Sequence, residues 1–267
     1  MCRLVCLPPN FPKKDAIEIM EEFVAANEDG TGSVYIKDGK FVVNKWPLDL
    51  DTVLKQKLPL FDHMPYDGWT LAHVRAISHG KKSVRNTHPF VKGEWAMAHN
   101  GIFHEYAPVK AVLQTLGKFE GETDSEVAAT LWQVVGRQKF IESLDRSGVF
   151  MFLKNNGQLD VVCCTGGDLQ FQKTKYGILM ASELAHDKYR RSHTVLEGSF
   201  KLSKKGNFIH ANWEKDEGAN WGYMSPSHWA VDYNDWEDDD DLDIDKKYKS
   251  KPKIVSYSWG NRHIAYD

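Results

Sequence analysis

Residues 149–164 read Val-Phe-Met-Phe-Leu-Lys-Asn-Asn-Gly-Gln-Leu-Asp-Val-Val-Cys-Cys, which is two apolar runs joined through Asn156-Gly157. Asn-Gly favours two-residue hairpin turns, because both of its residues accept a positive φ. We therefore expect antiparallel strands over 149–154 and 159–164. Two more hairpins are expected, at Asp38-Gly39 between strands 33–36 and 41–43, and at Lys205-Gly206 between strands 199–203 and 207–211.

Helical patterns lie between these strand regions. Apolar residues recur at helical spacing over 12–26, over 108–116 and from Thr123 onward, where Val127, Leu131 and Val134 are expected to face the core. Thr123 and Glu126 have the Thr-x-x-Glu spacing of a capping box, which places Asp124 in the first turn. We expect the first helix to end in the segment 28–32, and further strands over 70–77, 95–103 and 178–182.

The order of strands, then helices, then strands predicts an α+β protein in which helices cover antiparallel sheets. The chain has 267 residues, enough for one large domain or two small ones. The composition changes beyond residue 212, so we expect one domain over 2–212 and an extension over 213–267. Within that extension, residues 236–253 form an acidic run followed by a lysine-rich run, which is typical of a solvated segment rather than a specific docking tail.

Charge and hydropathy exclude several classes of protein. The chain has 34 Lys and Arg against 37 Asp and Glu, a net charge of −3, which argues against nucleic acid as a partner. No apolar run reaches the roughly 18 residues of a membrane span, and no secretory signal is visible, so we expect a cytoplasmic protein without membrane contact. Neither the four cysteines nor the six histidines between His63 and His104 have metal-ligand spacing, and no metal site is expected.

Cys2 follows the initiator methionine directly. Removal of Met1 would give this residue both a thiol and a free α-amine. The amine has an ordinary pKa of about 7.7 to 8.0, so it can take a proton from the thiol near neutral pH. A nucleophile activated by its own terminal amine is an established catalytic arrangement. A cysteine at the second position is a weak signal by itself, and the motifs that accompany it decide its interpretation.

Four motifs follow in order: Ala-His-Val-Arg-Ala-Ile-Ser-His-Gly at 72–80, Asn-Thr-His-Pro-Phe at 86–90, Ala-His-Asn-Gly-Ile-Phe at 98–103 and Glu-Thr-Asp-Ser-Glu at 122–126. Together with the opening Met-Cys-Arg-Leu, they resemble the class II glutamine amidotransferases, which are N-terminal-nucleophile hydrolases. The opening looks most like that of the small stand-alone members. The resemblance spans roughly residues 2–185 and includes Ala181-Ser182-Glu183 as a weaker late match. It implies a four-layer αββα sandwich of two antiparallel sheets between helical layers.

The resemblance also implies a reaction. The thiolate of Cys2 would attack the side-chain amide of glutamine, release ammonia and leave a thioester that water hydrolyses to glutamate. The Asn100 side chain and the Gly101 backbone N–H would stabilise the oxyanion of the tetrahedral intermediate. Asn-Gly by itself is more often a tight turn, and its neighbours in the motif favour the catalytic interpretation. This chemistry needs no cofactor.

Four residues would bind the substrate, according to the same resemblance. Arg75 matches the arginine that binds the α-carboxylate of glutamine, and Asp124 matches the acid that binds its α-ammonium. Asp124 would also stabilise the N-terminus of its helix, whichever ligand it binds. Ser78 and His79 would line the pocket. Ala76 stands where synthase-linked members often have tryptophan, so the resemblance gives no support for a tight aromatic lid.

Three functions stay open at this stage. The first is a glutaminase that passes ammonia to an acceptor on a synthase partner protein, since the residues after the matched region are largely acidic or lysine-rich. The second is a hydrolase of another γ-glutamyl amide or peptide, because Arg75 and Asp124 would contact only the glutamyl head. The third is a non-catalytic binding protein, which applies if Met1 is retained and blocks the Cys2 amine.

Overall fold

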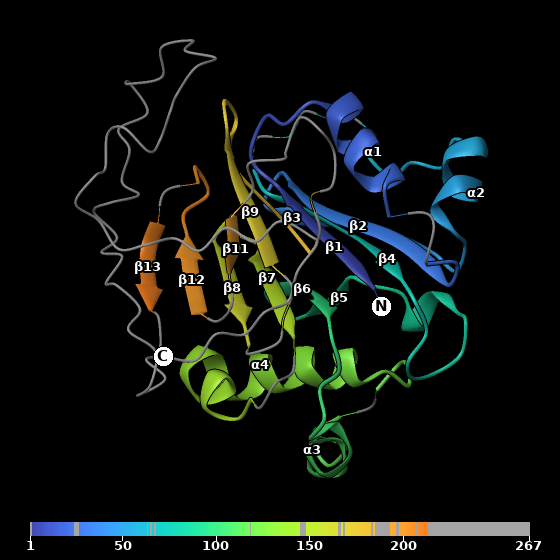
Figure 1. Ribbon diagram of the computed structural model, residues 1–267. Helices are drawn as coiled ribbons and strands as arrows, with labels where there is room; N and C mark the ends of the chain where they lie inside the picture. The colour runs from blue at the N-terminus through green and yellow to red at the C-terminus, as the bar shows by residue number, and fades with distance from the viewer. Residues whose placement is uncertain are drawn as a thin grey trace, which may run out of the picture.

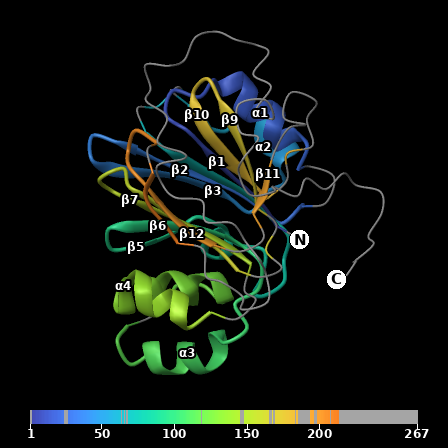
Figure 2. The same cartoon turned by 60° about the vertical axis from the view of Figure 1, so that its left-hand side comes forward.

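The computed structural model describes residues 2–23, 27–62, 64, 66, 68–117, 119–144, 148–164, 167, 169–182, 184, 193–195, 198–206 and 208–212. These residues form two antiparallel sheets that pack face to face between helical layers (Figures 1 and 2). The predicted four-layer αββα architecture is confirmed. Met1, Glu183 and the predicted extension over 213–267 lie outside the described residues.

The first sheet contains the N-terminal strand and the two strands of the hairpin at Asp38-Gly39. Its members are β1 (Arg3–Leu7), β2 (Gly30–Lys37), β3 (Lys40–Trp46), β4 (Thr70–Arg75), β9 (Leu169–Thr174), β10 (Gly177–Ala181) and β11 (His193–Val195). Their order is β11-β9-β10-β1-β4-β2-β3. Strand β1 is therefore central, with β4 as one of its neighbours.

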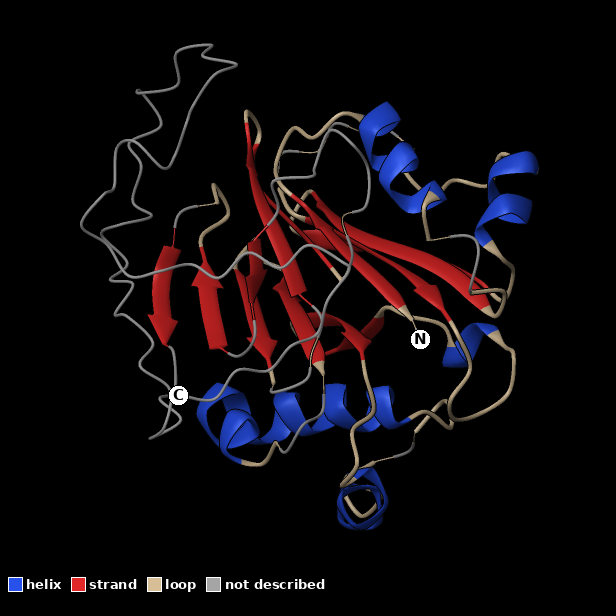
Figure 3. Cartoon of the chain, in the orientation of Figure 1, coloured by secondary structure: helices blue, strands red, loops and turns tan. Residues whose placement is uncertain are grey.

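The second sheet is formed mainly by the middle of the chain. Its members are β5 (Phe90–Lys92), β6 (Trp95–Asn100), β7 (Val149–Lys154), β8 (Leu159–Cys163), β12 (Gly198–Leu202) and β13 (Phe208–Asn212), in the order β13-β12-β8-β7-β6-β5. Figure 3 shows the strands of both sheets in red between the blue helices. The sheets bury an apolar core between them that includes Leu4, Leu71, Ala98 and Met151.

Two pairs of helices complete the outer layers. Helices α1 (Lys13–Glu21) and α2 (Leu50–Lys55) cover the first sheet through a second apolar cluster. On the other side, α4 (Asp124–Glu142) packs against the second sheet, and α3 (Tyr106–Leu113) packs against α4 (Figure 2). A short 3-10 helix, η2 (Val84–Asn86), precedes β5. In the part of the chain that the structure describes, no helix is long and apolar enough to span a bilayer.

The predicted hairpins form. Asp38 and Gly39 adopt φ values of 52° and 70° between β2 and β3, as a two-residue turn between right-twisted strands requires. Gly157 joins β7 to β8 with a φ of 90°, and Gly206 lies between β12 and β13 with a φ of 87°. Asn207, the predicted first residue of the last strand, lies outside the described residues.

Two local expectations are wrong. The first helix was expected to end in the segment 28–32, but α1 ends at Glu21 and β2 already begins at Gly30. A Cβ at Gly32 would lie 2.1 Å from the carbonyl oxygen of His88, so this glycine serves a close approach between backbones. Val134, expected in the core, is 50% exposed, and α4 is interrupted nearby at Gly136, where φ is 77° and ψ is 175°. The core positions along this part of α4 belong to Trp132 and Phe140.

Candidate functional site

The predicted site residues lie where β1 begins and where β4 and β6 end. Antiparallel pairing places Arg3 opposite Val74, so Cys2 comes next to Arg75, the last residue of β4. The strands expected over 70–77 and 95–103 are shorter than predicted and end at Arg75 and Asn100. Behind these ends, Nε2 of His73 lies 3.0 Å from the carbonyl oxygen of His99, which joins β4 to β6 across the two sheets.

Cys2 is partly buried, and Ala76 contacts its sulfur with both backbone polar groups. The N–H of Ala76 donates to Sγ at 3.4 Å, and Sγ lies 3.4 Å from the carbonyl oxygen of Ala76. Burial raises the pKa of the Cys2 thiol, although the hydrogen bond to Ala76 and the charge of Arg75 act in the opposite direction. The thiol is therefore neutral at neutral pH, and a base must deprotonate it before it can attack.

Arg75 is buried, and the loop that follows it surrounds its guanidinium. Nη2 donates to the carbonyl oxygen of His79 at 2.7 Å, and Nη1 donates to that of Lys81 at 3.1 Å. Burial lowers the pKa of Arg75, while Cys2, Asp29 and Asp124 raise it. An arginine keeps its charge under these conditions, so the buried guanidinium remains a cation.

Asp124 occupies the first turn of α4, as predicted. Thr123 is the N-cap, and its hydroxyl accepts the N–H of Glu126 at 3.2 Å. The carboxylate of Asp124 is buried and accepts the N–H of Phe103 at 2.8 Å, which connects α4 to the segment after β6. In a capping box the glutamate side chain accepts the backbone N–H of the N-cap residue. Here Glu126 accepts the backbone N–H groups of Glu120 and Gly121 instead.

Asn100 and Gly101 form a sharp bend at the end of β6. Gly101 has a φ of 149°, a conformation that residues with a side chain rarely adopt. The backbone just before β7 approaches closely here, since a Cβ at Gly148 would lie 2.3 Å from the carbonyl oxygen of Asn100. Asn100 itself is buried and carries a side-chain amide that can donate a hydrogen bond.

The other two predicted binding residues differ in their surroundings. His79 is partly buried, and its ring lies edge-on to that of Tyr106 with centroids 5.0 Å apart. Ser78 is exposed. The carbonyl of His79 accepts a hydrogen bond from Arg75, whereas Ser78 lies at the surface of the loop. The backbone of Ala76 contacts the thiol and was not predicted, because a role played by backbone atoms leaves no signal in the residue type.

Three buried histidines lie on β4, on β6 and before β5. The rings of His73 and His88 lie 3.9 Å apart, and His99 stacks on Phe150 at 4.1 Å. Burial lowers the pKa of His73 to about 3 and that of His88 well below its usual value. In the described part of the chain, no three His, Cys, Asp or Glu side chains are arranged to hold a metal ion.

The family model described as "Glutamine amidotransferases class-II" matches residues 68–174. The chain contains a class II glutamine amidotransferase domain. The matched stretch begins just before β4 and includes Arg75, Ser78, His79, Asn100, Gly101 and Asp124. Cys2 precedes the matched stretch, and its proximity to the amidotransferase motifs comes from the pairing of β1 with β4.

Curated relatives match part of this amidotransferase domain. Glutamine–fructose-6-phosphate aminotransferase of Aquifex aeolicus is 39% identical over 106 residues, which is 39% of this chain and 17% of that protein. The Helicobacter pylori enzyme of the same name is 32% identical over 133 residues, which is 49% of this chain and 22% of that protein. The chain spans less than a quarter of the length of either relative.

Solved structures share the fold at low sequence identity. Glutamine phosphoribosylpyrophosphate amidotransferase of B. subtilis superposes with a TM-score of 0.62 at 19% identity, over 77% of this chain and 48% of that one. A glutamine aminotransferase class-II domain protein of Silicibacter pomeroyi has a TM-score of 0.52 at 15% identity, over 77% of this chain and 96% of that one. At these identities the likeness concerns the fold alone.

Proposed function

We propose that this amidotransferase domain hydrolyses the side-chain amide of glutamine to glutamate and ammonia, with Cys2 as the nucleophile. The observation that carries the proposal is that Cys2 lies next to Arg75 through the pairing of β1 with β4, and that the charges of Arg75 and Asp124 both act on its thiol. Asp124 also accepts the N–H of Phe103, three residues after Asn100 at the end of β6. These residues supply a thiol, a cation, an amide donor and a carboxylate. Free glutamine presents a matching amide carbonyl, α-carboxylate and α-ammonium.

The first step forms a thioester. Removal of Met1 frees the α-amine of Cys2, which takes the thiol proton while sulfur attacks the amide carbon. The carbonyl oxygen becomes an oxyanion that accepts hydrogen bonds from Asn100 Nδ2 and the Gly101 N–H. The protonated amine then donates its proton to the leaving nitrogen, the carbon–nitrogen bond breaks, and ammonia leaves.

The second step reverses the roles. The same amine accepts a proton from water, and the hydroxide attacks the thioester carbon. The carbon–sulfur bond breaks, glutamate leaves, and the thiol regains its proton. Because burial raises the pKa of the Cys2 thiol, the neutral amine limits the rate at low pH. We therefore expect kcat/KM to rise with pH as the amine loses its proton, near its ordinary pKa of about 7.7 to 8.0.

The buried charges of Arg75 and Asp124 fit the two ends of an amino acid. A guanidinium binds a carboxylate through two parallel hydrogen bonds, and a carboxylate accepts bonds from an ammonium. Neither residue would contact the group beyond the amide. Ser78 and His79 would line the rest of the pocket. Measuring turnover of free glutamine beside that of γ-glutamyl peptides tests this substrate assignment, and faster cleavage of the peptides would replace glutamine by that class.

The state of the N-terminus decides between enzyme and binding protein. Intact-mass measurement of the natural protein should give a chain that begins at Cys2. A protein that keeps Met1 and does not release ammonia from glutamine would contradict catalysis and favour a non-catalytic binding role.

We further propose that ammonia goes to an acceptor bound by a partner protein, and that residues 213–267 form a separate extension. Co-purification from the native source tests for this partner, and deletion of residues 236–267 tests the extension as its contact. Recovery of the chain alone, with activity unchanged by the deletion, would contradict this part of the proposal.

A further inference from the structure

We propose that Asn86 is a positioning residue that sets the spacing between Arg75 and Asp124, and so controls how tightly the site binds free glutamine. This inference rests on the proposed function, because it assumes that these two charges bind the ends of the substrate. Asn86 lies in η2 and is buried. Its role would be indirect, since it acts on the two segments that carry the binding groups.

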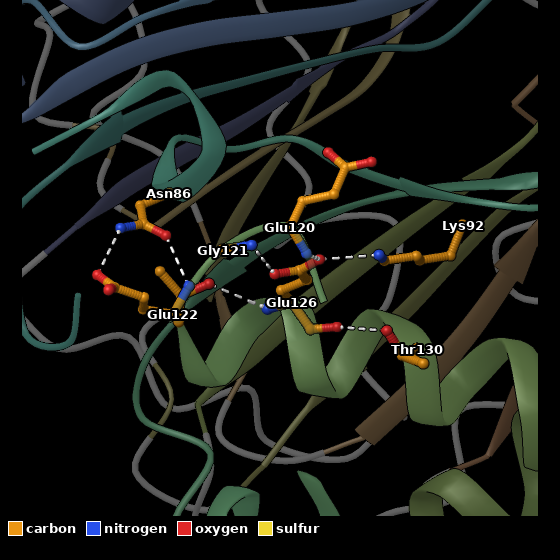
Figure 4. Close-up of polar contacts among 8 residues, drawn as sticks. Asn86, Lys92, Glu120, Gly121, Glu122, Glu126 and Thr130 are labelled. Atoms are coloured by element: carbon orange, nitrogen blue, oxygen red, sulfur yellow. Dashed lines mark hydrogen bonds and ion pairs between the residues drawn. The ribbon is translucent and has the colours of Figure 1, made fainter. Parts of the chain in front are cut away.

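The side-chain amide of Asn86 bridges those two segments. On one side, Nδ2 donates at 2.8 Å to the carbonyl oxygen of Lys81, the same oxygen that accepts Nη1 of Arg75. On the other side, Oδ1 accepts the N–H of Glu122 at 2.8 Å, two residues before Asp124 (Figure 4). One amide thus fixes a carbonyl that holds the arginine and a backbone group next to the aspartate.

Two glycines make room for this amide. A Cβ at Gly80, where φ is +75°, would lie 2.8 Å from Nδ2 of Asn86. A Cβ at Gly121 would lie 2.5 Å from Oδ1. Both distances are shorter than real Cβ contacts, so a side chain at either position would displace the amide. The residues around Asn86 therefore suit a tight connection between the two segments.

The segment before α4 is held from its other side by a buried carboxylate. Glu126 accepts the N–H of Gly121 at 2.7 Å and that of Glu120 at 2.9 Å, and Nζ of Lys92 lies 2.8 Å from the same carboxylate (Figure 4). This segment is thus fixed to α4 by Glu126 and to the loop of Arg75 by Asn86. A change at Asn86 weakens the connection to the loop of Arg75, while Glu126 still holds the segment that leads to Asp124 against α4.

The orientation of the amide gives a sharp variant. Asn86→Asp keeps the size of the side chain, but it places an oxygen opposite the Lys81 carbonyl and a negative charge beside Glu122 Oε2, which lies 3.4 Å from Nδ2. Asn86→Ala removes all three hydrogen bonds of the amide. Glu122→Ala changes an exposed residue whose carboxylate accepts the Lys81 N–H at 3.1 Å, so this variant weakens the same connection without disturbing the core.

The test compares steady-state hydrolysis of glutamine with alkylation of Cys2 by iodoacetamide, which does not need Arg75. For Asn86→Ala we expect KM to rise about tenfold, the equivalent of one hydrogen bond, with kcat within about threefold and the alkylation rate unchanged. Asn86→Asp should raise KM at least as much, and Glu122→Ala should raise it less. Asn156→Ala, at the exposed turn between β7 and β8, is the matched control and should change none of these values.

A double-mutant cycle with Arg75→Lys separates positioning from general disruption. If Asn86 acts through Arg75, the two changes are not additive, and Asn86→Ala adds less than about twofold to KM in the Arg75→Lys protein. Additive effects, an unchanged KM in all three variants, or a loss of alkylation that parallels the loss of turnover would overturn the inference. Wild-type protein that neither hydrolyses nor binds glutamine would overturn the proposed function itself, and with it this inference.

Discussion

Helix α4 carries a buried ion pair near each of its ends, and the two pairs differ in their surroundings. Near its start, the carboxylate of Glu126 pairs with Lys92 at 2.8 Å. After the break at Gly136, Arg137 pairs with the buried carboxylate of Asp160 at 3.0 Å. Both acids are almost fully inaccessible, at 2% and 1% exposure. Their chemistry is the same, so their other partners decide what each pair does.

The Lys92–Glu126 pair makes its further hydrogen bonds to backbone groups, and the Arg137–Asp160 pair makes them to side chains. Glu126 holds the N–H groups of the segment that leads to Asp124. The second pair has side-chain partners: Gln158, just before β8, donates to Asp160 at 2.6 Å, and Arg137 donates to the hydroxyl of Ser199 on β12 at 2.9 Å. It lines a hollow of about 270 Å³ beside Trp95 and Trp132, at the opposite end of β6 from Asn100. We therefore predict that a change in the first pair affects the site, and that a change in the second affects stability but not the site.

The largest expected effect lies at the site end. Cys2→Ala should lower glutamine hydrolysis by at least about 10⁴-fold, because the nucleophile is lost. Glutamine binding and the free energy of unfolding should stay unchanged, since the thiol is at the edge of the core. Cys6→Ala, in the buried part of β1, is the matched control and should keep its turnover. An active Cys2→Ala protein, assayed for ammonia release, would end the proposed mechanism.

The second effect concerns the Arg137–Asp160 pair, and it should be a loss of stability without a loss of activity. Arg137→Ala leaves the buried carboxylate of Asp160 without its cation, and we expect it to lower the free energy of unfolding by about 3 to 5 kcal/mol. KM for glutamine should not change. Urea unfolding measures the first quantity, with Lys139→Ala, an exposed change on the same helix, as the control. A raised KM in folded Arg137→Ala protein would show that the two ends are coupled.

The third effect is on KM and concerns Arg75, the charge that we propose binds the substrate. Arg75→Ala should raise KM for glutamine by about 10- to 150-fold, because a hydrogen bond to a charged group contributes roughly 1.5 to 3 kcal/mol. The value of kcat should fall much less. The KM of Arg75→Lys should lie between those of Arg75→Ala and the wild type, since a lysine keeps the charge but loses the paired donors. An unchanged KM in Arg75→Ala would remove Arg75 from the binding site.

The smallest effect is the change of the free energy of unfolding with pH. Two buried groups, His73 and Asp160, should change it in opposite directions. His73 takes up a proton near pH 6.5 when unfolded but only near pH 3 when folded, so its stabilising contribution is present above pH 6.5 and is lost as the pH falls toward 3. This loss should reach about 2 kcal/mol between pH 6.5 and pH 5. Asp160 acts oppositely, because burial raises its pKa and its ionised form costs stability as the pH rises.

Urea unfolding at pH 7 and pH 5 checks this balance. The wild type should be less stable at pH 5, and the difference should shrink in His73→Gln. A free energy of unfolding that does not change between the two pH values would contradict the assignment of buried neutral histidines.

Local turn chemistry made the hairpins and the start of α4 predictable. Asp38-Gly39 and Asn156-Gly157 need only their own backbone preferences, and Thr123 caps its helix through a residue three positions away. Strands β1, β5, β9 and β11 and helix α2 were not predicted. For α2 there is a readable signal, because Asp49 caps it by accepting the Thr52 N–H at 2.7 Å. The need for glycine at position 32 could not be predicted, because the group that approaches it is the carbonyl of His88, which is distant in the sequence.

The same distinction holds for the site. Motif order singles out Cys2, Arg75 and Asp124 as candidates, because the chemistry that we propose for them uses their own side chains. Asn86 stood within a quoted motif, yet no role could be assigned to it, because its partners are the backbone of Lys81 and of Glu122, 36 residues away. Sequence patterns find the reacting groups, whereas residues that position them become visible only from contacts between distant segments.

The central claim is that Cys2 is the nucleophile of a glutamine site. It is tested most directly by mass-spectrometric mapping after exposure to a glutamine-like diazoketone, which alkylates a thiol held next to the bound amide position. We predict one adduct, on Cys2, which excess glutamine suppresses and Arg75→Ala slows. The account would be contradicted by an unmodified Cys2, or by equal labelling of Cys2 and the buried thiols of Cys6, Cys163 and Cys164.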